Sequence, residues 1–561
     1  MTLTANRPAL PSSVSTPGVS EGAAVLPESP LTTSDHKRIG RYYIAAAVLF
    51  VLVGTVIGIL LEVQLSSSGA NVTGSQYDRL FNLHTTVSSL LFLPLLFTGL
   101  ATYLVPLQIG ARRLAFPRVQ ALALWGSVAG GLLLLASYTF GKPTGWGIAY
   151  PTALPFAKAG ASRATDLWAG ALMLVAFCAV LSAANLFVTV VKLRAPGMTM
   201  LRVPAFTWSV LAVSAAILLA TPVFIAGLLL IYLDEHFGGG LFRPTQVNGN
   251  LVWQHLLWLY GRPDVYLVIV PALGGLTDVV TTHARRPLVQ PAAAKVLIFA
   301  AMLLCFGILA SDQTIEKAVL LPTPSVLSLL VAAPVGLLTL LWLGTIRPAE
   351  VRLHVSLLYV AGFVILLLAG FVNGVIAASQ HLHGGLTGAG SAWTVGQVHA
   401  VLFGAPTLAA FGAVYHWGPK LYGRSLNALL GALQWLLLLG GFLISALASW
   451  LAGYDGAPWH VTTYTGPRSA DWFNYGKLGV AGGVLIALGL LVFVANAALT
   501  WARSRRASEA DRPGDPYDAG TLEWATSSPP PDQDFDVIPD VRSDTPFADW
   551  KATRTPAGSA A

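Results

Sequence analysis

The sequence predicts an all-α membrane protein with about twelve transmembrane helices. Hydrophobic residues make up 55% of the 561-residue chain, charged residues make up only 11%, and the mean hydropathy is +0.65. A soluble domain of this size carries more charge on its surface, so the composition excludes the soluble globular classes. The apolar residues gather in runs of about 20, the length that an α-helix needs to cross a bilayer.

The predicted spans follow one another along most of the chain and are joined by short polar connections. Each run is counted as one crossing, because it is long enough for a helix and mostly apolar. The spans lie near residues 42–64, 81–108, 119–139, 166–192, 205–233, 251–279, 294–312, 325–346, 353–377, 393–416, 425–452 and 476–502.

Basic residues are distributed unevenly over the connections. Far more of them lie before the first span and in alternate connections than in the opposite loops. The enriched group is Lys37, Arg38, Arg41, Arg112, Arg113, Lys192, Arg194, Arg202, Arg285, Arg286, Lys420, Arg424, Arg503, Arg505 and Arg506. Positively charged loops stay in the cytoplasm, so both termini are predicted to be cytoplasmic. Membrane topology therefore explains the net charge of +7, and no nucleic-acid partner is indicated.

Two polar tails flank one membrane domain. Residues 1–34 are rich in Ser, Pro, Ala and Thr, lack the pattern of a signal peptide, and are predicted to be a disordered cytoplasmic tail. The membrane domain covers residues 35–505, and the polar, Pro-rich residues 506–561 are predicted to be an extended cytoplasmic tail. The two cysteines, Cys178 and Cys305, lie in separate apolar spans and indicate buried free thiols.

One predicted span contains charged residues. Arg262, Asp264 and Tyr266 lie within Leu251–Gly275, which otherwise has the composition of a membrane-spanning helix. A guanidinium or a carboxylate inside hydrocarbon costs at least ~2.5–3.5 kcal/mol, so such groups need partners and indicate a functional site.

Several motifs, in order along the chain, carry a family resemblance. They include Thr33–Gly40 (TSDHKRIG), Leu104–Ala111 (LVPLQIGA), Gln254–Trp258 (QHLLW) and Thr521–Trp524 (TLEW), the last followed by Ser527–Pro531 (SSPPP). Together they span roughly residues 33–545, and with them the chain resembles subunit I of the haem-copper oxidases, the cytochrome c oxidase family. The resemblance implies that family's helix arrangement and a role in the aerobic respiratory chain. It also implies two haems and a copper held by histidines of neighbouring helices.

Two histidines match the ligands of the family's low-spin haem. His84, in Phe81–His84 (FNLH), falls on the second span, and His399, in Gly396–Ala400 (GQVHA), falls on the tenth. The resemblance therefore implies one six-coordinate haem, of type a or b, with an imidazole on each face. The alternative is that each histidine is a buried side chain satisfied by a backbone carbonyl.

The ligands of the oxygen-reducing centre are replaced. The resemblance places the ligand of the high-spin haem at Gln397, one copper ligand at Arg262, and the two remaining copper histidines in a stretch that contains Asp312 and no histidine. Arginine stays protonated and offers only donors, so it cannot ligate copper. Copper is therefore not expected, and Arg262 is predicted to pair with Asp312, with Asp264 sharing the charge. Tyr266 is retained without the histidine that the family joins to it.

The family's proton routes and haem edge are also altered. The family's eighth-helix lysine aligns near Leu338 of this chain. The family's aspartate at the entry of a proton route aligns with Arg113. His460, His381 and His383 are candidates for contact with a haem propionate or a metal in a loop. Glu62 stands where members with haem A often carry arginine, which leaves the haem type open.

Three functions remain open from the sequence. The first is an oxidase-like subunit that keeps one low-spin haem for electron transfer and does not reduce oxygen by itself. The second is an active terminal oxidase with unusual ligands, in which Asp264 or Tyr266 contributes to catalysis. The third is a haem-free structural or transport subunit. An oxidase-like role implies a prokaryotic plasma membrane, partner subunits of the subunit II and III kinds, and an electron donor such as cytochrome c or a quinol.

Overall fold

The computed structural model describes residues 29–69, 72–141, 162–238, 266–307, 324–347, 351–378, 391–505, 514–535, 537–538 and 540–554. Arg262, Asp264, Asp312, His381 and His383 lie outside these ranges, so the predictions for them remain predictions. The helices before residue 300 are α1 (His36–Leu65), α2 (Gly74–Thr86), α3 (Leu93–Ile109), α4 (Pro117–Ser137), α5 (Arg163–Lys192), α6 (Ala205–Phe237), α9 (Ile269–Ala284) and α10 (Pro291–Gly307). The later ones are α12 (Pro324–Ile346), α13 (Val355–Ala378), α14 (Ala392–Gln397), α15 (Ala405–His416), α16 (Gly418–Tyr422), α17 (Ala428–Tyr454), α18 (Ser469–Arg505) and α19 (Pro546–Arg554).

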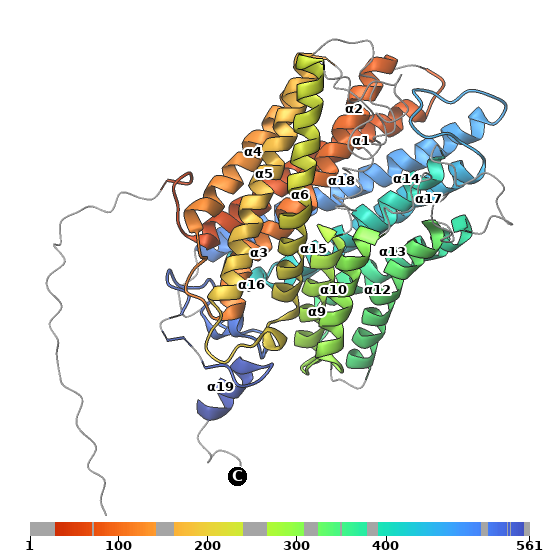
Figure 1. Cartoon of the computed structure of the whole chain (residues 1–561). Helices are drawn as coiled ribbons and strands as arrows, with labels where there is room; N and C mark the ends of the chain where they lie inside the picture. The colour runs from red at the N-terminus through yellow and green to blue at the C-terminus, as the bar shows by residue number, and fades with distance from the viewer. Residues whose placement is uncertain are drawn as a thin grey trace, which may run out of the picture.

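The all-α membrane fold predicted from the sequence is confirmed. In the described ranges, nine helices are long and apolar enough to cross a membrane, and Pro291–Cys305 and Ala332–Ile346 are shorter apolar helices. The count of twelve spans itself stays a prediction. In Figure 1, α4, α5 and α6 lie side by side, and α17 and α18 run at an angle to them.

Local sequence determines where the helices begin and end. The Asp35 carboxylate accepts a hydrogen bond from the backbone N–H of Lys37 and caps α1. Thr73 and Gln76 form a reciprocal capping box at the start of α2. Gly110 adopts a left-handed conformation, with φ of 72°, and ends α3.

Small residues bring the helices into close contact. A Cβ atom at Gly441 of α17 would lie 2.8 Å from the carbonyl oxygen of Gly482 on α18, and the reverse distance is also 2.8 Å. Backbones can approach this closely only where side chains are absent, which is how helices pack inside membranes.

The two spans that carry His84 and His399 lie in the interior of the bundle. In the most apolar stretch of each span, 83% of the residues are buried in Gly74–Ile109 and 72% in Ala392–His416. The corresponding share in Ser469–Arg505 is only 28%. α18 is therefore peripheral, and its large apolar side chains face outward, where lipid covers them.

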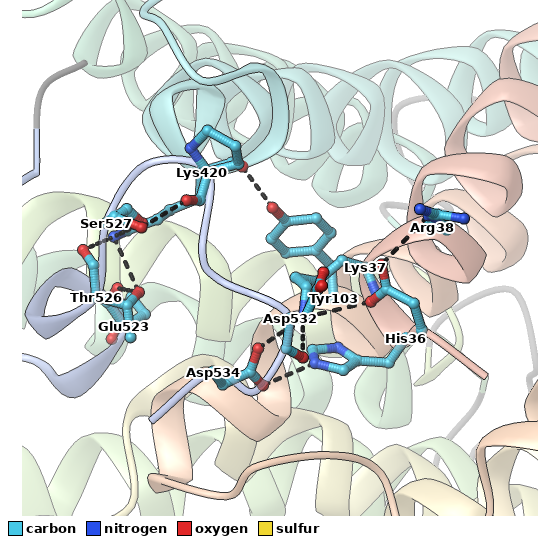
Figure 2. A network of polar contacts seen from close by, with 12 residues as sticks. His36, Lys37, Arg38, Tyr103, Lys420, Glu523, Thr526, Ser527, Asp532 and Asp534 are labelled. Atoms are coloured by element: carbon cyan, nitrogen blue, oxygen red, sulfur yellow. Dashed lines mark hydrogen bonds and ion pairs between the residues drawn. The ribbon is translucent and has the colours of Figure 1, made fainter. Parts of the chain in front are cut away.

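Residues 514–554, here called the tail segment, pack against one end of the bundle, here called the tail end (Figure 1). The carboxylate of Asp534 lies 2.7 Å from Nε2 of His36 and 2.9 Å from Nζ of Lys37, both at the start of α1. Lys420 of α16 donates to the carbonyl oxygen of Thr526 at 2.7 Å, and Figure 2 shows these contacts together. The sequence predicts an extended tail for residues 506–561; in its described part, apolar side chains such as Trp524 are buried against the bundle.

Candidate functional site

The imidazole of His84 is fixed against the backbone of α1. Its Nδ1 lies 2.8 Å from the carbonyl oxygen of Gly54. A carbonyl can only accept a hydrogen bond, so Nδ1 carries the proton and Nε2 keeps a free lone pair. A Cβ atom at Gly58 would lie 2.8 Å from Cε1 of the same ring, so the ring reaches this position only because residue 58 is glycine. Two glycines of α1 thus orient a neutral imidazole.

The imidazole of His399 has no hydrogen-bond partner within the described residues, and its Nδ1 atom is buried. It lies close enough to His84 for a charge on one ring to act on the other. A polar ring with no hydrogen bond inside a bundle is costly unless another group binds it. The pair therefore offers two neutral nitrogen ligands from two interior helices.

Both spans contain a π-helical segment at the histidine. Segment η1 (Val87–Phe92) begins three residues after His84, and η4 (Val398–Gly404) contains His399. Pro94 and Pro406 follow these segments at the starts of α3 and α15. Proline lacks an N–H and crowds the carbonyl four residues before it, which favours a local change of helix pitch. Such π segments occur frequently at functional sites.

Gln397, which the family resemblance aligns with the high-spin haem ligand, is turned toward α13. Its Nε2 donates to the carbonyl oxygen of Gly370 at 2.9 Å, and its Oε1 is buried without a partner in the described structure. The amide nitrogen is thus occupied by a helix carbonyl rather than left free as a ligand.

The other predicted positions are spread over the bundle. Tyr266 is fully buried just before α9, Leu338 is buried on α12, and Arg113 is exposed between α3 and α4. His460 is partly buried, lies 3.4 Å from the carboxylate of Asp78 on α2, and packs edge-on to Phe81 at 4.6 Å between ring centroids. His460 is thereby brought to the helix that carries His84.

A second polar group at the tail end was not predicted from the sequence. His283 of α9 lies between His354, before α13, and His416 of α15: Nε2 of His283 is 3.3 Å from Nδ1 of His416 and 3.0 Å from the Ser356 hydroxyl. Within the described ranges, no three His, Cys, Asp or Glu side chains are arranged to hold a metal ion. No motif marks it, because each histidine comes from a different part of the chain.

Two buried carboxylates lie close to this group. Gln108 Nε2 donates to Asp278 at 3.0 Å and to Glu523 at 3.3 Å, so one amide joins α3, α9 and the tail segment. Burial raises the pKa of the Glu523 carboxyl above its usual range. The TLEW motif thus places its glutamate inside the protein rather than on the surface.

Comparison with known proteins decides the family. The family model described as "Cytochrome C and Quinol oxidase polypeptide I" matches residues 38–508. The chain belongs to this cytochrome c oxidase subunit I family. A Streptomyces coelicolor protein named for cytochrome c oxidase subunit 1-beta is 36% identical over 522 residues, 92% of this chain and 89% of that protein. Cytochrome c oxidase subunit 1 of Corynebacterium glutamicum is 32% identical over 523 residues, 92% of this chain and 87% of that protein.

The solved structures agree on the fold. A haem-copper terminal oxidase dimer matches with a TM-score of 0.67 and 17% identity, over 83% of this chain and 84% of that one. Membership of the cytochrome c oxidase subunit I family implies haem cofactors, membrane association and further oxidase subunits, and the bacterial relatives support a prokaryotic plasma membrane. The donor set of this subunit I-like chain suits a haem at His84 and His399, since His399 has a buried ring nitrogen without a partner and His84 has a free lone pair.

Proposed function

We propose that this chain is a subunit I-like membrane haemoprotein of the aerobic respiratory chain that holds one low-spin haem between His84 and His399. It transfers electrons and does not reduce oxygen by itself. The observation that carries the proposal is the orientation of His84 by the Gly54 carbonyl, near a His399 ring that has no other partner.

The haem, when bound, supplies one-electron oxidation and reduction. His84 and His399 would ligate its iron, and a haem held by two histidines would transfer electrons rather than bind oxygen. Gly54 fixes the tautomer of His84, and Gly58 leaves room for its ring. His460 and its neighbour Asp78, which lies six residues before His84 on α2, are candidates for contact with the haem edge.

The oxygen-reducing centre is proposed to be lost. Arg262 brings a fixed positive charge to the copper position, and Gln397 uses its amide nitrogen on Gly370. We propose that Arg262 forms an ion pair with Asp312 and that Asp264 supplies part of the negative charge that balances Arg262. Removing one partner of such a buried pair costs ~3–5 kcal/mol. Arg262→Gln should therefore lower thermal stability, and adding Asp312→Asn should restore part of it; independent, additive effects of the two changes would contradict the pairing.

One observation favours a second function, an active terminal oxidase with unusual ligands. The relatives named cytochrome c oxidase subunit 1 match over about nine tenths of this chain. Under either function the protein works with subunit II- and III-like partners and an electron donor such as cytochrome c or a quinol. The basic connections indicate that the tail end is cytoplasmic.

The test is the haem content of variants. His84→Ala and His399→Ala should each abolish the bound haem of the purified protein, because each removes an axial ligand. His354→Ala is the matched control, since this histidine lies at the tail end and should leave the haem content unchanged. Unchanged haem in both ligand variants would overturn the proposal.

A further inference from the structure

A large cavity opens at the tail end between the membrane helices and the tail segment. Its volume is about 840 Å³, within the usual range for ligand sites. The start of α6, the end of α9, the start of α10 and residues 518–521 and 544–551 of the tail segment form its walls. No residue of the haem site lines it, so it is separate from the site described above.

The cavity has an excess of positive charge. Five cationic side chains line it, against three carboxylates: Arg202, Arg285, Arg286, Lys295 and Lys551 face Asp278, Asp518 and Asp544. The carboxylate of Asp518 forms two ion pairs, at 3.0 Å from the Arg285 guanidinium and at 2.6 Å from the Lys551 ammonium.

Three of the cations have no carboxylate partner within the described residues. Arg202 donates only to the backbone carbonyls of Gly197 and Val541, and Lys295 donates only to that of Leu201. The Arg286 side chain is exposed and makes no hydrogen bond or ion pair in the described structure. Their charges therefore remain available to an anion.

Of the other two carboxylates, Asp278 is held by hydrogen-bond donors and makes no ion pair with the three cations in the described structure. Asp278 accepts hydrogen bonds from the backbone N–H groups of Ala205 and Phe206, at 3.0 and 3.1 Å, and from Gln108. Its oxygens are thus occupied by donors from the start of α6 and from α3. The first turn of α10, from Pro291 to Ala294, also lines the cavity, and the positive end of a helix dipole favours an anion there.

An apolar surface leads away from the cavity along α10. Leu201 is 62% exposed beside Arg202, and Val296 and Phe299 of α10 are 65% and 44% exposed. A ligand with a charged head and an apolar chain satisfies both surfaces, and in a membrane that ligand is a lipid.

We propose that this cavity binds the phosphate group of an anionic phospholipid, with an acyl chain lying along α10. The phosphate lies among Arg202, Arg286 and Lys295. The carboxylate of Asp544 repels a head group that carries more negative charge. The proposal does not depend on the haem; it relies on the membrane setting alone.

The test is lipid binding to the purified full-length protein in a neutral detergent, measured by native mass spectrometry. Phosphatidylglycerol should bind saturably and phosphatidylcholine much more weakly. Arg286→Gln should weaken phosphatidylglycerol binding about fivefold, the effect of one basic residue near a membrane surface. The matched control is Arg352→Gln, because Arg352 is also exposed, does not line the cavity and should not change the affinity.

Other outcomes overturn the proposal. Equal affinities of the Arg286 and Arg352 variants, or equal binding of the two lipids, would show that the cavity does not select a phosphate. Binding of inorganic phosphate that depends on Arg286, without binding of phosphatidylglycerol, would replace the lipid with a soluble phosphate. Haem content is measured on the same samples, so failure of this proposal and failure of the haem proposal are read separately.

Discussion

The Nδ1 atom of His84 lies 2.8 Å from the carbonyl oxygen of Gly54, thirty residues earlier on the neighbouring helix. This contact makes His84 a donor at Nδ1 and leaves Nε2 as the atom that can bind a metal. His399, close by on an interior helix, has no comparable contact in the described structure. The orientation of one histidine and the lack of partners of the other are the basis of the haem proposal.

Gly58→Ala should weaken haem binding while the protein stays folded. The new methyl group would lie 2.8 Å from Cε1 of His84 and push the ring away from Gly54. Loss of an orienting hydrogen bond typically costs about 10- to 100-fold in metal affinity. Haem retention during gel filtration measures this. Gly170→Ala on α5 is the control, because no atom lies within 4 Å of its new Cβ; equal haem retention in both variants would contradict the role of Gly58.

Gln397→Ala should leave the haem spectrum unchanged. The substitution removes one hydrogen bond to Gly370, worth about 0.5–1.5 kcal/mol, and no ligand. Optical spectra and thermal unfolding of the purified variant separate these two effects. A changed or missing haem band would show that Gln397 takes part in ligation.

Asp534→Ala should release the tail segment from the bundle. The carboxylate is fully buried between His36 and Lys37, and leaving these groups without their partner costs ~3–5 kcal/mol. Hydrogen exchange of residues 514–554 should become much faster. Asp532→Ala is the matched control, because only the backbone carbonyl of Asp532 contacts Lys37. Equal exchange in the two variants would exclude Asp534 as the anchor.

Acidification should loosen the tail segment through His354. Burial lowers the pKa of His354 from 6.5 to about 4, so the unfolded chain binds the proton more tightly than the folded one. The stability that depends on neutral His354 is complete above about pH 6.5 and is lost as the pH falls toward 4. Exchange of the tail segment, corrected for its intrinsic pH dependence, measures this. His354→Asn should reduce the slope of the profile between pH 6.5 and 4, where the neighbouring His283 and His416 still contribute, and a profile identical to that of the unmodified protein would refute the assignment.

The sequence predicted the membrane fold and the family, because hydropathy and motif order are local features. It also singled out His84 and His399, since each stands in a short motif; their role as haem ligands stays a prediction. The tail segment was less predictable: its composition is polar, and burial of Trp524 and Asp534 depends on surfaces contributed by α1 and α16. The contact between His84 and Gly54 joins two helices, and no sequence pattern within either helix predicts it.

The π segments could have been anticipated only in part. Pro94 and Pro406 are visible in the sequence, but proline also starts many ordinary helices, as Pro117 starts α4. The group of His283, His354 and His416 had no sequence signal, because the fold alone brings these residues together.

The central claim is a single six-coordinate haem without an oxygen-reducing centre. The most direct measurement is the reduced-minus-oxidised spectrum of the purified protein, recorded with and without carbon monoxide, together with a copper assay on the same sample. The account predicts one low-spin haem band that carbon monoxide does not shift, and no bound copper. A carbon monoxide shift accompanied by stoichiometric copper would contradict it.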